Sequence, residues 1–149
     1  MVITERIKNL FIIYQQAFKH YDIKDVEACY QIPCTLTTPD EFILVNSKVE
    51  FTEQFDKIFN QLQQAKTKAC TIKSASYQLI SNNLLLVCID WLFIDIDDKA
   101  FTDFTAFYHL IDVNGKLKIA HVTSQPSEQS VALENTLNFD DLEQIKVIK

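Results

Sequence analysis

Residues 68–125 read KACTIKSASYQLISNNLLLVCIDWLFIDIDDKAFTDFTAFYHLIDVNGKLKIAHVTSQ. Four long runs rich in β-branched and aromatic residues are separated there by three polar pairs, Asn82-Asn83, Asp97-Asp98 and Asn114-Gly115. Such pairs occupy the centres of tight turns between antiparallel strands. The segment therefore predicts a four-stranded antiparallel meander.

The turns also set which residues lie opposite each other in the sheet. A turn centred on Asn114-Gly115 pairs Leu110 with Ile119 and Tyr108 with His121. Counting back through the other turns assigns one face to Ile72, Ser74, Ser76, Gln78, Ile80, Val87, Ile89, Trp91, Phe93, Thr102, Phe104, Ala106, Tyr108, Leu110, Asp112, Leu117, Ile119 and His121. The opposite face receives Leu86, Cys88, Asp90, Leu92, Ile94, Phe101, Asp103, Thr105, Phe107, His109 and Ile111. A shift of one residue at a turn would exchange the two faces.

Three amphipathic helices are predicted before the meander. Apolar residues recur at intervals of three and four over residues 3–21, which indicates a helix of about five turns. Asp22 begins a second, short helix whose buried side carries Ile23, Val26 and Tyr30. The Ser-x-x-Glu pattern at residues 47–50 is typical of a capping box, so a third helix starts there and ends near Ala65.

A small hairpin and a C-terminal extension complete the predicted organisation. Cys34–Thr38 and Phe42–Val45 flank a Pro-Asp-Glu turn and predict the hairpin. After Pro126 the pattern weakens to a loop with one helical turn, followed by a short helix from Asn138. The chain has no internal repeat and no Gly/Ser-rich linker, so we expect one α+β domain, residues 1–126, and an extension, residues 127–149.

Composition excludes several classes of function. The net charge is −6, and no Lys/Arg cluster interleaves with aromatic residues, which disfavours binding to nucleic acid or to an anionic membrane. The cysteines have no C-x-x-C spacing and lie in apolar runs, which predicts reduced core thiols with neither disulfides nor a metal site: Cys29, Cys34, Cys70 and Cys88. The N-terminal apolar stretch is interrupted by polar residues at helical spacing, unlike a signal peptide or a membrane span. We therefore expect a cytoplasmic protein that needs no cofactor.

The second face of the meander is too apolar for a solvated surface. Three helices can cover only one side of a curved sheet, which leaves Leu92, Phe101, Phe107 and Ile111 without cover. A second copy of the chain packed face to face would bury them. The sequence thus predicts a homodimer that forms through the outer sheet face.

The order of elements, and the segment from Gly115 to Ser124, resembles the nuclear-transport-factor-2-like superfamily, in particular its SnoaL-like branches. In these families the last strand commonly reads Gly-x-Trp-x-Ile-x-His; Gly115, Ile119 and His121 fit, whereas Leu117 replaces the aromatic residue. The resemblance covers about residues 3–125. It implies a cone-shaped fold around an apolar cavity, used by isomerases, dehydratases, polyketide cyclases, transport adaptors and oligomerisation domains. The ketosteroid isomerase branch uses an Asp base with Tyr and protonated Asp donors, and this chain offers a Tyr without a matching Asp pair.

The polar groups predicted to line such a cavity centre on His121 opposite Tyr108, with Trp91 nearby. An imidazole in an apolar pocket can exchange a proton near neutral pH, and a phenol can donate to an oxyanion, which makes His121 and Tyr108 the candidate catalytic pair. Equally, His121 could be a core histidine bonded to Tyr108. With Tyr14 and Phe104, these residues form the predicted binding set for a small apolar ligand.

Three functions remain open at this stage: a small-molecule binding protein, a cofactor-independent isomerase, cyclase or dehydratase, and an association module. If the strand register is shifted, Asp90, Asp103 and His109 would enter the pocket as the acid/base set instead. A pocket larger than about 300 Å³ would favour the first two functions, and a solid interior the third.

Overall fold

The predicted meander forms and occupies the middle of a larger sheet in the computed structural model, which describes residues 2–139. Its strands are β3 (Thr67–Ser81), β4 (Leu84–Asp95), β5 (Ala100–Val113) and β6 (Lys116–Gln125). At the last turn Asn114 and Gly115 have φ values of 53° and 86°, as a type I′ hairpin turn requires. The loop between β4 and β5 is longer than the predicted two residues and spans residues 96–99.

The sheet has seven strands, more than the four-stranded meander and separate hairpin that we expected. The hairpin strands β1 (Tyr30–Thr37) and β2 (Phe42–Val45) join it because β1 pairs with β6 in parallel. A short strand, β7 (Asn135–Leu137), pairs with β3 at the opposite edge. The order is β2-β1-β6-β5-β4-β3-β7, so the sheet is mixed and open. Parallel strands are distant in sequence, so no turn motif could have predicted the pairing of β1 with β6.

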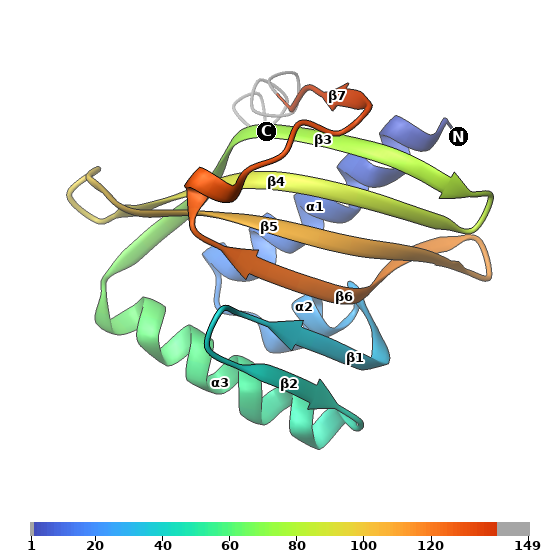
Figure 1. The fold of residues 1–149 in the computed structure, drawn as a ribbon. Coiled ribbons are helices and arrows are strands. Elements are labelled where there is room, and N and C mark those ends of the chain that lie inside the picture. Colours follow the sequence, from blue (N-terminus) through green and yellow to red (C-terminus); the bar gives the residue numbers. More distant parts are fainter. Residues whose placement is uncertain (1, 140–149) are drawn as a thin grey trace.

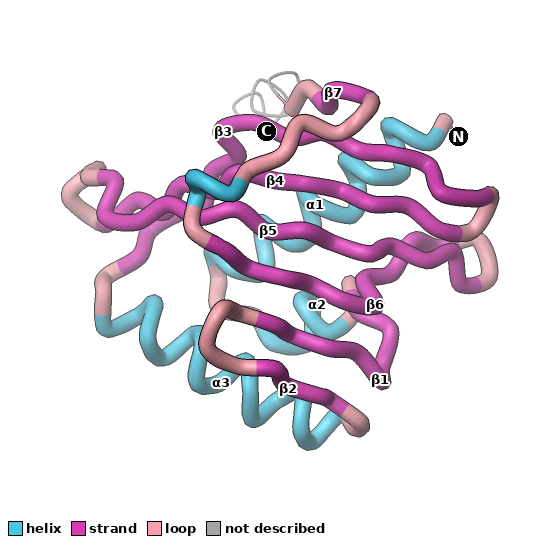
Figure 2. Tube along the Cα trace, in the orientation of Figure 1, coloured by secondary structure: helices cyan, strands magenta, loops and turns pink. Residues whose placement is uncertain are grey.

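All three predicted helices are confirmed, as α1 (Ile3–Lys19), α2 (Ile23–Glu27) and α3 (Lys48–Gln64). The Ser47 hydroxyl caps α3 by accepting from the Glu50 amide at 3.2 Å. Tyr30 begins β1 rather than belonging to α2, which corrects its predicted place. Figure 1 shows α1 and α3 on one side of the curved sheet, and the strands in front of them can be followed in Figure 2.

The hydrophobic core lies between the helices and the sheet face that they cover, the inner face. Phe11 of α1 is fully buried, and its ring centroid lies 4.8 Å from that of Tyr108. The predicted inner face of β4 and β5 is confirmed, since these residues are at most 1% exposed: Val87, Ile89, Trp91, Ala106, Tyr108 and Leu110.

Irregularities in β6 and β3 overturn part of the predicted register. Leu110 pairs with Ile119 as expected, but the next pair is His109 with His121, and Tyr108 faces Val122. The register shifts between these pairs because Ala120 adds one residue to β6. An extra residue of this kind moves every later side chain to the opposite face, so His121 lies on the outer face.

The register of β3 shifts in the same way at both ends. Ala75 pairs with Ile89 and Tyr77 with Val87, which places Ala75 and Tyr77 on the inner face. The predicted inner residues of this stretch, Ser74, Ser76 and Gln78, are therefore outer residues. The turn at residues 82–83 was counted correctly, but a register shift between Leu79 and Ser81 reversed the alternation beyond it.

Residues 126–139, which we call the C-terminal strap, cross the outer face of the sheet (Figure 1). The strap contains one short 3₁₀ helix, η1 (Ser127–Gln129), and the strand β7. The sequence predicted one helical turn in this segment but not the strand. Beneath it Cys88 is 3% exposed and Thr105 is fully buried. The helix predicted from Asn138 onward falls almost entirely outside the described residues.

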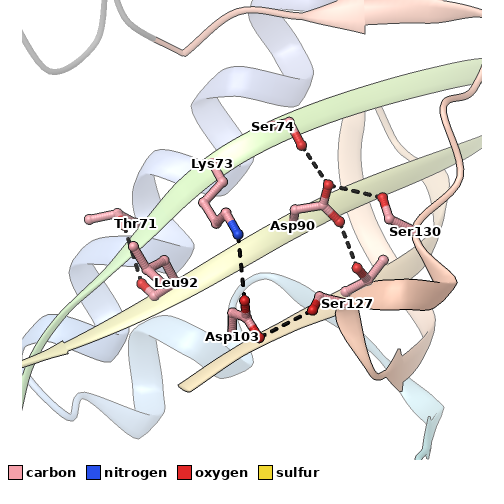
Figure 3. Close-up of polar contacts among 9 residues, drawn as sticks. Thr71, Lys73, Ser74, Asp90, Leu92, Asp103, Ser127 and Ser130 are labelled. Carbon is pink, nitrogen blue, oxygen red and sulfur yellow. Dashed lines mark hydrogen bonds and ion pairs between the residues drawn. The ribbon is translucent and has the colours of Figure 1, made fainter. Parts of the chain in front are cut away.

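Two carboxylates attach the strap to the sheet (Figure 3). The Ser130 hydroxyl donates to Asp90 Oδ2 at 2.9 Å, and the Ser127 hydroxyl donates to Asp103 Oδ1 at 3.2 Å. Asp103 also forms an ion pair with Lys73, with Nζ and Oδ2 3.5 Å apart. These contacts hold the strap over the half of the outer face formed by β3, β4 and β5.

The four cysteines are buried, as predicted for core positions. Among residues 2–139, none of the helices has both the length and the apolar character needed to span a membrane. The same residues place no group of three or more His, Cys, Asp or Glu side chains where they could hold a metal ion.

Candidate ligand-binding cavity

A cavity of about 420 Å³ lies between the inner face of the sheet, the hairpin β1–β2 and helix α3. Figure 1 shows α1 behind the upper strands of the sheet and α3 beside the hairpin at the other end. The lining residues come from all these elements: Tyr14, Phe18, Tyr30, Leu36, Thr37, Thr38, Glu41, Ile43, Gln54, Phe55, Lys57, Ile58, Gln61, Cys70, Trp91, Phe93, Phe104, Tyr108, Val122 and Ser124.

Four aromatic side chains from four elements meet at the floor of the cavity. Tyr14 comes from α1, Tyr30 from β1, Trp91 from β4 and Tyr108 from β5. The ring of Tyr14 stacks on that of Trp91 at 5.9 Å and meets that of Tyr108 edge-on at 5.9 Å. Large rings with few rotamers give the floor a defined shape.

The floor contains hydrogen-bonding groups that stay uncharged. The Trp91 indole Nε1 donates to the Tyr108 hydroxyl at 3.0 Å, and the hydroxyls of Tyr14 and Tyr30 are 3.5 Å apart. Burial raises the pKa of all three phenols well above the usual value near 10. They are therefore neutral at physiological pH and serve as hydrogen-bond donors and acceptors.

Polar side chains surround the mouth of the cavity. Glu41 from the hairpin and Lys57 from α3 are exposed there, next to Gln54 and Gln61. An apolar interior with a polar rim is the usual form of a small-molecule site.

The structure brings together four of the five residues in the predicted binding set. Tyr14, Trp91, Phe104 and Tyr108 line the cavity, and His121 does not. The predicted pair of His121 and Tyr108 is wrong, because the extra residue in β6 turns the imidazole to the outer face. The Tyr108 hydroxyl bonds to Trp91 instead.

On the outer face His121 is held by two threonines. Its Nδ1 contacts the Thr35 hydroxyl, and its Nε2 lies 2.8 Å from the Thr123 hydroxyl. Its ring centroid is 5.3 Å from that of His109. Burial, and secondarily the charge of His109, lower the pKa of His121 below its usual value. This histidine cannot act as a base on a molecule in the cavity.

The alternative acid/base set also lies outside the cavity. Asp90, Asp103 and His109 occupy the outer face, so the alternative with a shifted register is wrong as well. Asp90 accepts from the hydroxyls of Ser74 at 2.5 Å and Thr105 at 2.6 Å, in addition to Ser130 of the strap. These contacts give the aspartate a role in holding the strap.

Sequence reasoning missed Tyr30 and most of the wall formed by β1, β2 and α3. A usable signal was present, since residues 30, 32, 34 and 36 are all apolar and alternate with polar residues or proline. That alternation is typical of a strand and would have placed Tyr30 and Leu36 on one face. The contribution of Val122 and Ser124 depended on the irregularity in β6, which no sequence signal reveals.

The fold and the cavity define an α+β protein with an open curved sheet and three helices over one face. The chain belongs to a family described as NTF2-like protein (DUF6841), whose model matches residues 4–127. No curated protein sequence matches the chain significantly.

Solved structures share the fold at low sequence identity. An NTF-2 like protein of unknown function from Shewanella oneidensis has a TM-score of 0.68 at 12% identity, over 83% of this chain and 99% of that one. A Streptomyces avermitilis protein of the NTF2-like family, provisionally described as a dehydratase, has a TM-score of 0.64 at 10% identity, over 83% and 94%. A Xanthomonas campestris protein, provisionally described as a calcium/calmodulin dependent protein kinase II association domain, has a TM-score of 0.60 at 15% identity, over 83% and 86%. At these identities the likeness establishes the fold alone.

Proposed function

We propose that this protein binds a small, largely apolar molecule in the cavity between α3, the hairpin and the inner sheet face. The observation that carries the proposal is the cavity itself, whose volume of about 420 Å³ exceeds the roughly 300 Å³ typical of the smallest ligand sites. A protein that served only as an association module would gain stability by filling this space, because closely packed interiors are more stable than hollow ones.

The lining residues indicate how such a ligand would lie. Tyr14, Trp91, Phe104 and Tyr108 offer flat apolar surfaces to a ring system, while Glu41 and the glutamines at the mouth face solvent. An aromatic or alicyclic body would therefore enter first and leave any polar substituent near the mouth.

Binding is better supported than catalysis. The ionisable side chains among the described lining residues are three tyrosines, Cys70, Glu41 and Lys57, with neither histidine nor aspartate. The raised pKa of the phenols makes them donors rather than bases. A reaction with His121 as the base is not supported, because the described lining residues of the cavity include no histidine.

A thermal-shift screen with a panel of apolar ring compounds tests the proposal. A ligand at about one hundred times its Kd stabilises a protein by about 2.7 kcal/mol, which corresponds to roughly 5–10 °C in Tm for a chain of this size. Ile58→Trp should remove the shift, because residue 58 lines the cavity and the larger ring would fill it.

Ile13→Trp provides the matched control. Ile13 lies on α1, is 50% exposed and is not part of the cavity, so this variant should keep the full thermal shift. A panel without any stabilising compound, or an undiminished shift in Ile58→Trp, would reject the cavity as a binding site.

We also propose that two copies associate through the outer face of the sheet. The strap covers the β3 and β4 side, but Phe107 and Ile111 on β5 remain half-buried, and Phe42 and Leu44 on β2 are 68% and 52% exposed. The pairings place Phe107 and Phe42 in one row across β5, β6, β1 and β2, with Thr123 and Thr37 between them. Leu44 lies in the adjacent row with Thr35, His121 and His109, so the uncovered half of the outer face is a contiguous surface of apolar, threonine and histidine side chains. A contiguous surface of this kind is typical of an interface.

Light scattering coupled to size exclusion tests the dimer. The wild-type chain should elute as a dimer at micromolar concentration, and Phe107→Glu should convert it to a monomer because a carboxylate would be buried without a partner. Leu79→Glu, at a 50% exposed position on β3 away from this surface, should remain dimeric. A monomeric wild type would refute the association.

A further inference from the structure

The hydroxyl groups on the cavity floor form a chain of hydrogen bonds with a defined direction. The indole N–H of Trp91 can only donate, so the Tyr108 oxygen accepts from it. The Tyr108 hydroxyl interacts in turn with that of Tyr14, and Tyr14 lies 3.5 Å from Tyr30, oxygen to oxygen. Three phenols carry three O–H protons and share two links, so one O–H has no phenol acceptor whichever way the links point. A donor lowers the pKa of the phenol that accepts from it, and Tyr108 lowers the pKa of Tyr14 while Tyr14 lowers that of Tyr30. The order is Trp91 to Tyr108 to Tyr14 to Tyr30.

The last hydroxyl in this chain keeps its own proton. Among the described residues, the Tyr30 hydroxyl has Tyr14 as its hydrogen-bond partner, and in the order given above Tyr30 is the acceptor. Tyr30 is 4% exposed and lines the cavity. A buried O–H without an acceptor is costly, so the floor presents an unused donor to whatever occupies the cavity.

The link between Tyr14 and Tyr30 is also loose. At 3.5 Å it exceeds the usual O–H···O distance of about 2.7–2.8 Å. An acceptor atom placed near both hydroxyls can therefore take a proton from Tyr30, and from Tyr14 as well if Tyr14 turns away from its neighbour. The bond from Trp91 to Tyr108, at 3.0 Å, has ordinary length and stays in place.

We propose that the Tyr30 hydroxyl selects ligands that carry a neutral hydrogen-bond acceptor, such as the carbonyl oxygen of a ketone, ester or amide, at the end buried in the cavity. This inference rests on the proposed ligand-binding function and narrows it to one chemical class. An ammonium group has no lone pair with which to accept the hydrogen bond from Tyr30, so it would meet an O–H donor with its own N–H donors. A carboxylate would have to lose its hydration beside neutral phenols, since the cationic side chain among the described lining residues, Lys57, is at the exposed mouth.

A pair of probes of matched shape tests the selection. 2-Acetylnaphthalene carries a carbonyl group, and 2-isopropenylnaphthalene replaces its oxygen by a CH₂ group. The ratio of their affinities, measured by isothermal titration, removes the contribution of the shared ring system. Tyr30→Phe should shift this ratio against the ketone about fivefold, the effect of one neutral hydrogen bond of about 1 kcal/mol.

Tyr77→Phe is the control variant, because Tyr77 is a phenol on the same sheet face, 9% exposed and outside the cavity. Its affinity ratio should equal that of the wild type. The infrared carbonyl stretch of the bound ketone gives a second readout that needs no variant. It should lie below its value in cyclohexane when wild-type protein binds the ketone, and it should return toward that value in Tyr30→Phe.

Each outcome decides the question. A ratio unchanged in Tyr30→Phe, an equal change in Tyr77→Phe, or a wild-type carbonyl frequency like that in cyclohexane would overturn the selection while leaving ligand binding intact. If neither probe binds, both the proposed function and this inference are rejected. If both probes bind with equal affinity, only the selection for a carbonyl group is rejected.

Discussion

Asp90 shows how one residue can connect distant parts of this fold. Its carboxylate receives hydroxyl groups from Ser74 on β3, Thr105 on β5 and Ser130 in the strap (Figure 3). Burial by itself raises the pKa of Asp90, but the three hydroxyls, together with the charge of Lys73, outweigh it and lower the pKa below its ordinary value of 3.8. The folded state therefore favours the ionised form.

Because the pKa of Asp90 is lowered in the folded state, the protein should lose stability when this carboxylate is protonated in acid. A lowered folded pKa contributes stability above about pH 4, and this contribution disappears as the pH falls through the folded value. Asp90→Asn should lower the free energy of unfolding at pH 7 by on the order of 1 kcal/mol, and the difference from wild type should shrink toward pH 3. Urea titrations at several pH values measure both.

Asp97→Asn, an exposed carboxylate in the β4–β5 loop, controls for the change in net charge. A stability difference between wild type and Asp90→Asn that stays constant from pH 7 to pH 3 would contradict the role of the ionised form.

At the scale of elements, irregular strands and a short strap decide what each face of the sheet displays. The extra residue Ala120 sends His121 outward and brings Val122 and Ser124 into the cavity wall. The strap then covers Cys88 and Thr105 on the opposite face. The outer face is thus divided into a half covered by the strap and a half that the described residues leave uncovered.

The strap should detach as a unit when its apolar anchor is removed. Leu137 of β7 is 4% exposed, and the Leu133 amide donates to the Ser76 hydroxyl at 2.9 Å. Leu137→Ala removes buried apolar contact, so hydrogen exchange at Leu133 and across β7 should accelerate at least tenfold. Exchange in β5 and β6 should stay as in wild type, because these strands keep their ladder bonds.

Leu79→Ala, a change of the same kind at a half-exposed position on β3, should leave the strap protected. Equal acceleration in all strands of Leu137→Ala would mean that the strap and the sheet open together, contrary to this prediction.

At the scale of the whole molecule, the core is a single apolar cluster that extends from α1 across the sheet to α3. Three of the thiols lie in this cluster, those of Cys29, Cys34 and Cys70, whereas Cys88 is buried on the outer face beneath the strap. Burial raises the pKa of Cys29 to about 12 and that of Cys34 to about 11. Thiolates are therefore scarce at neutral pH in the folded state.

Thiol reactivity should report global unfolding. With a disulfide reagent at pH 8, the native protein should react at least a hundredfold more slowly than the chain in guanidinium chloride, where all four thiols become accessible. A parallel measurement by circular dichroism should give the same unfolding midpoint. One thiol that reacts at the unfolded rate in native buffer would contradict uniform burial.

The elements of this fold were largely predictable because their signals are local. The caps at Asp22 and Ser47, the Asn114-Gly115 turn and the alternation in β4 and β5 act over a few residues, and all of them are confirmed. In the candidate site, Tyr14, Trp91, Phe104 and Tyr108 were found because regular periodicity placed them on the correct faces.

Tertiary structure decided the rest. The place of His121 depended on an extra residue in β6, the strand that pairs with both β5 and β1. Tyr30 joined the cavity floor through the parallel pairing of β1 with β6. The strap took part of the surface predicted for a partner by bonding to Asp90 and Asp103. Local sequence determines which conformations each segment prefers, whereas the register of distant strands depends on free energies summed over contacts that form only in the folded chain.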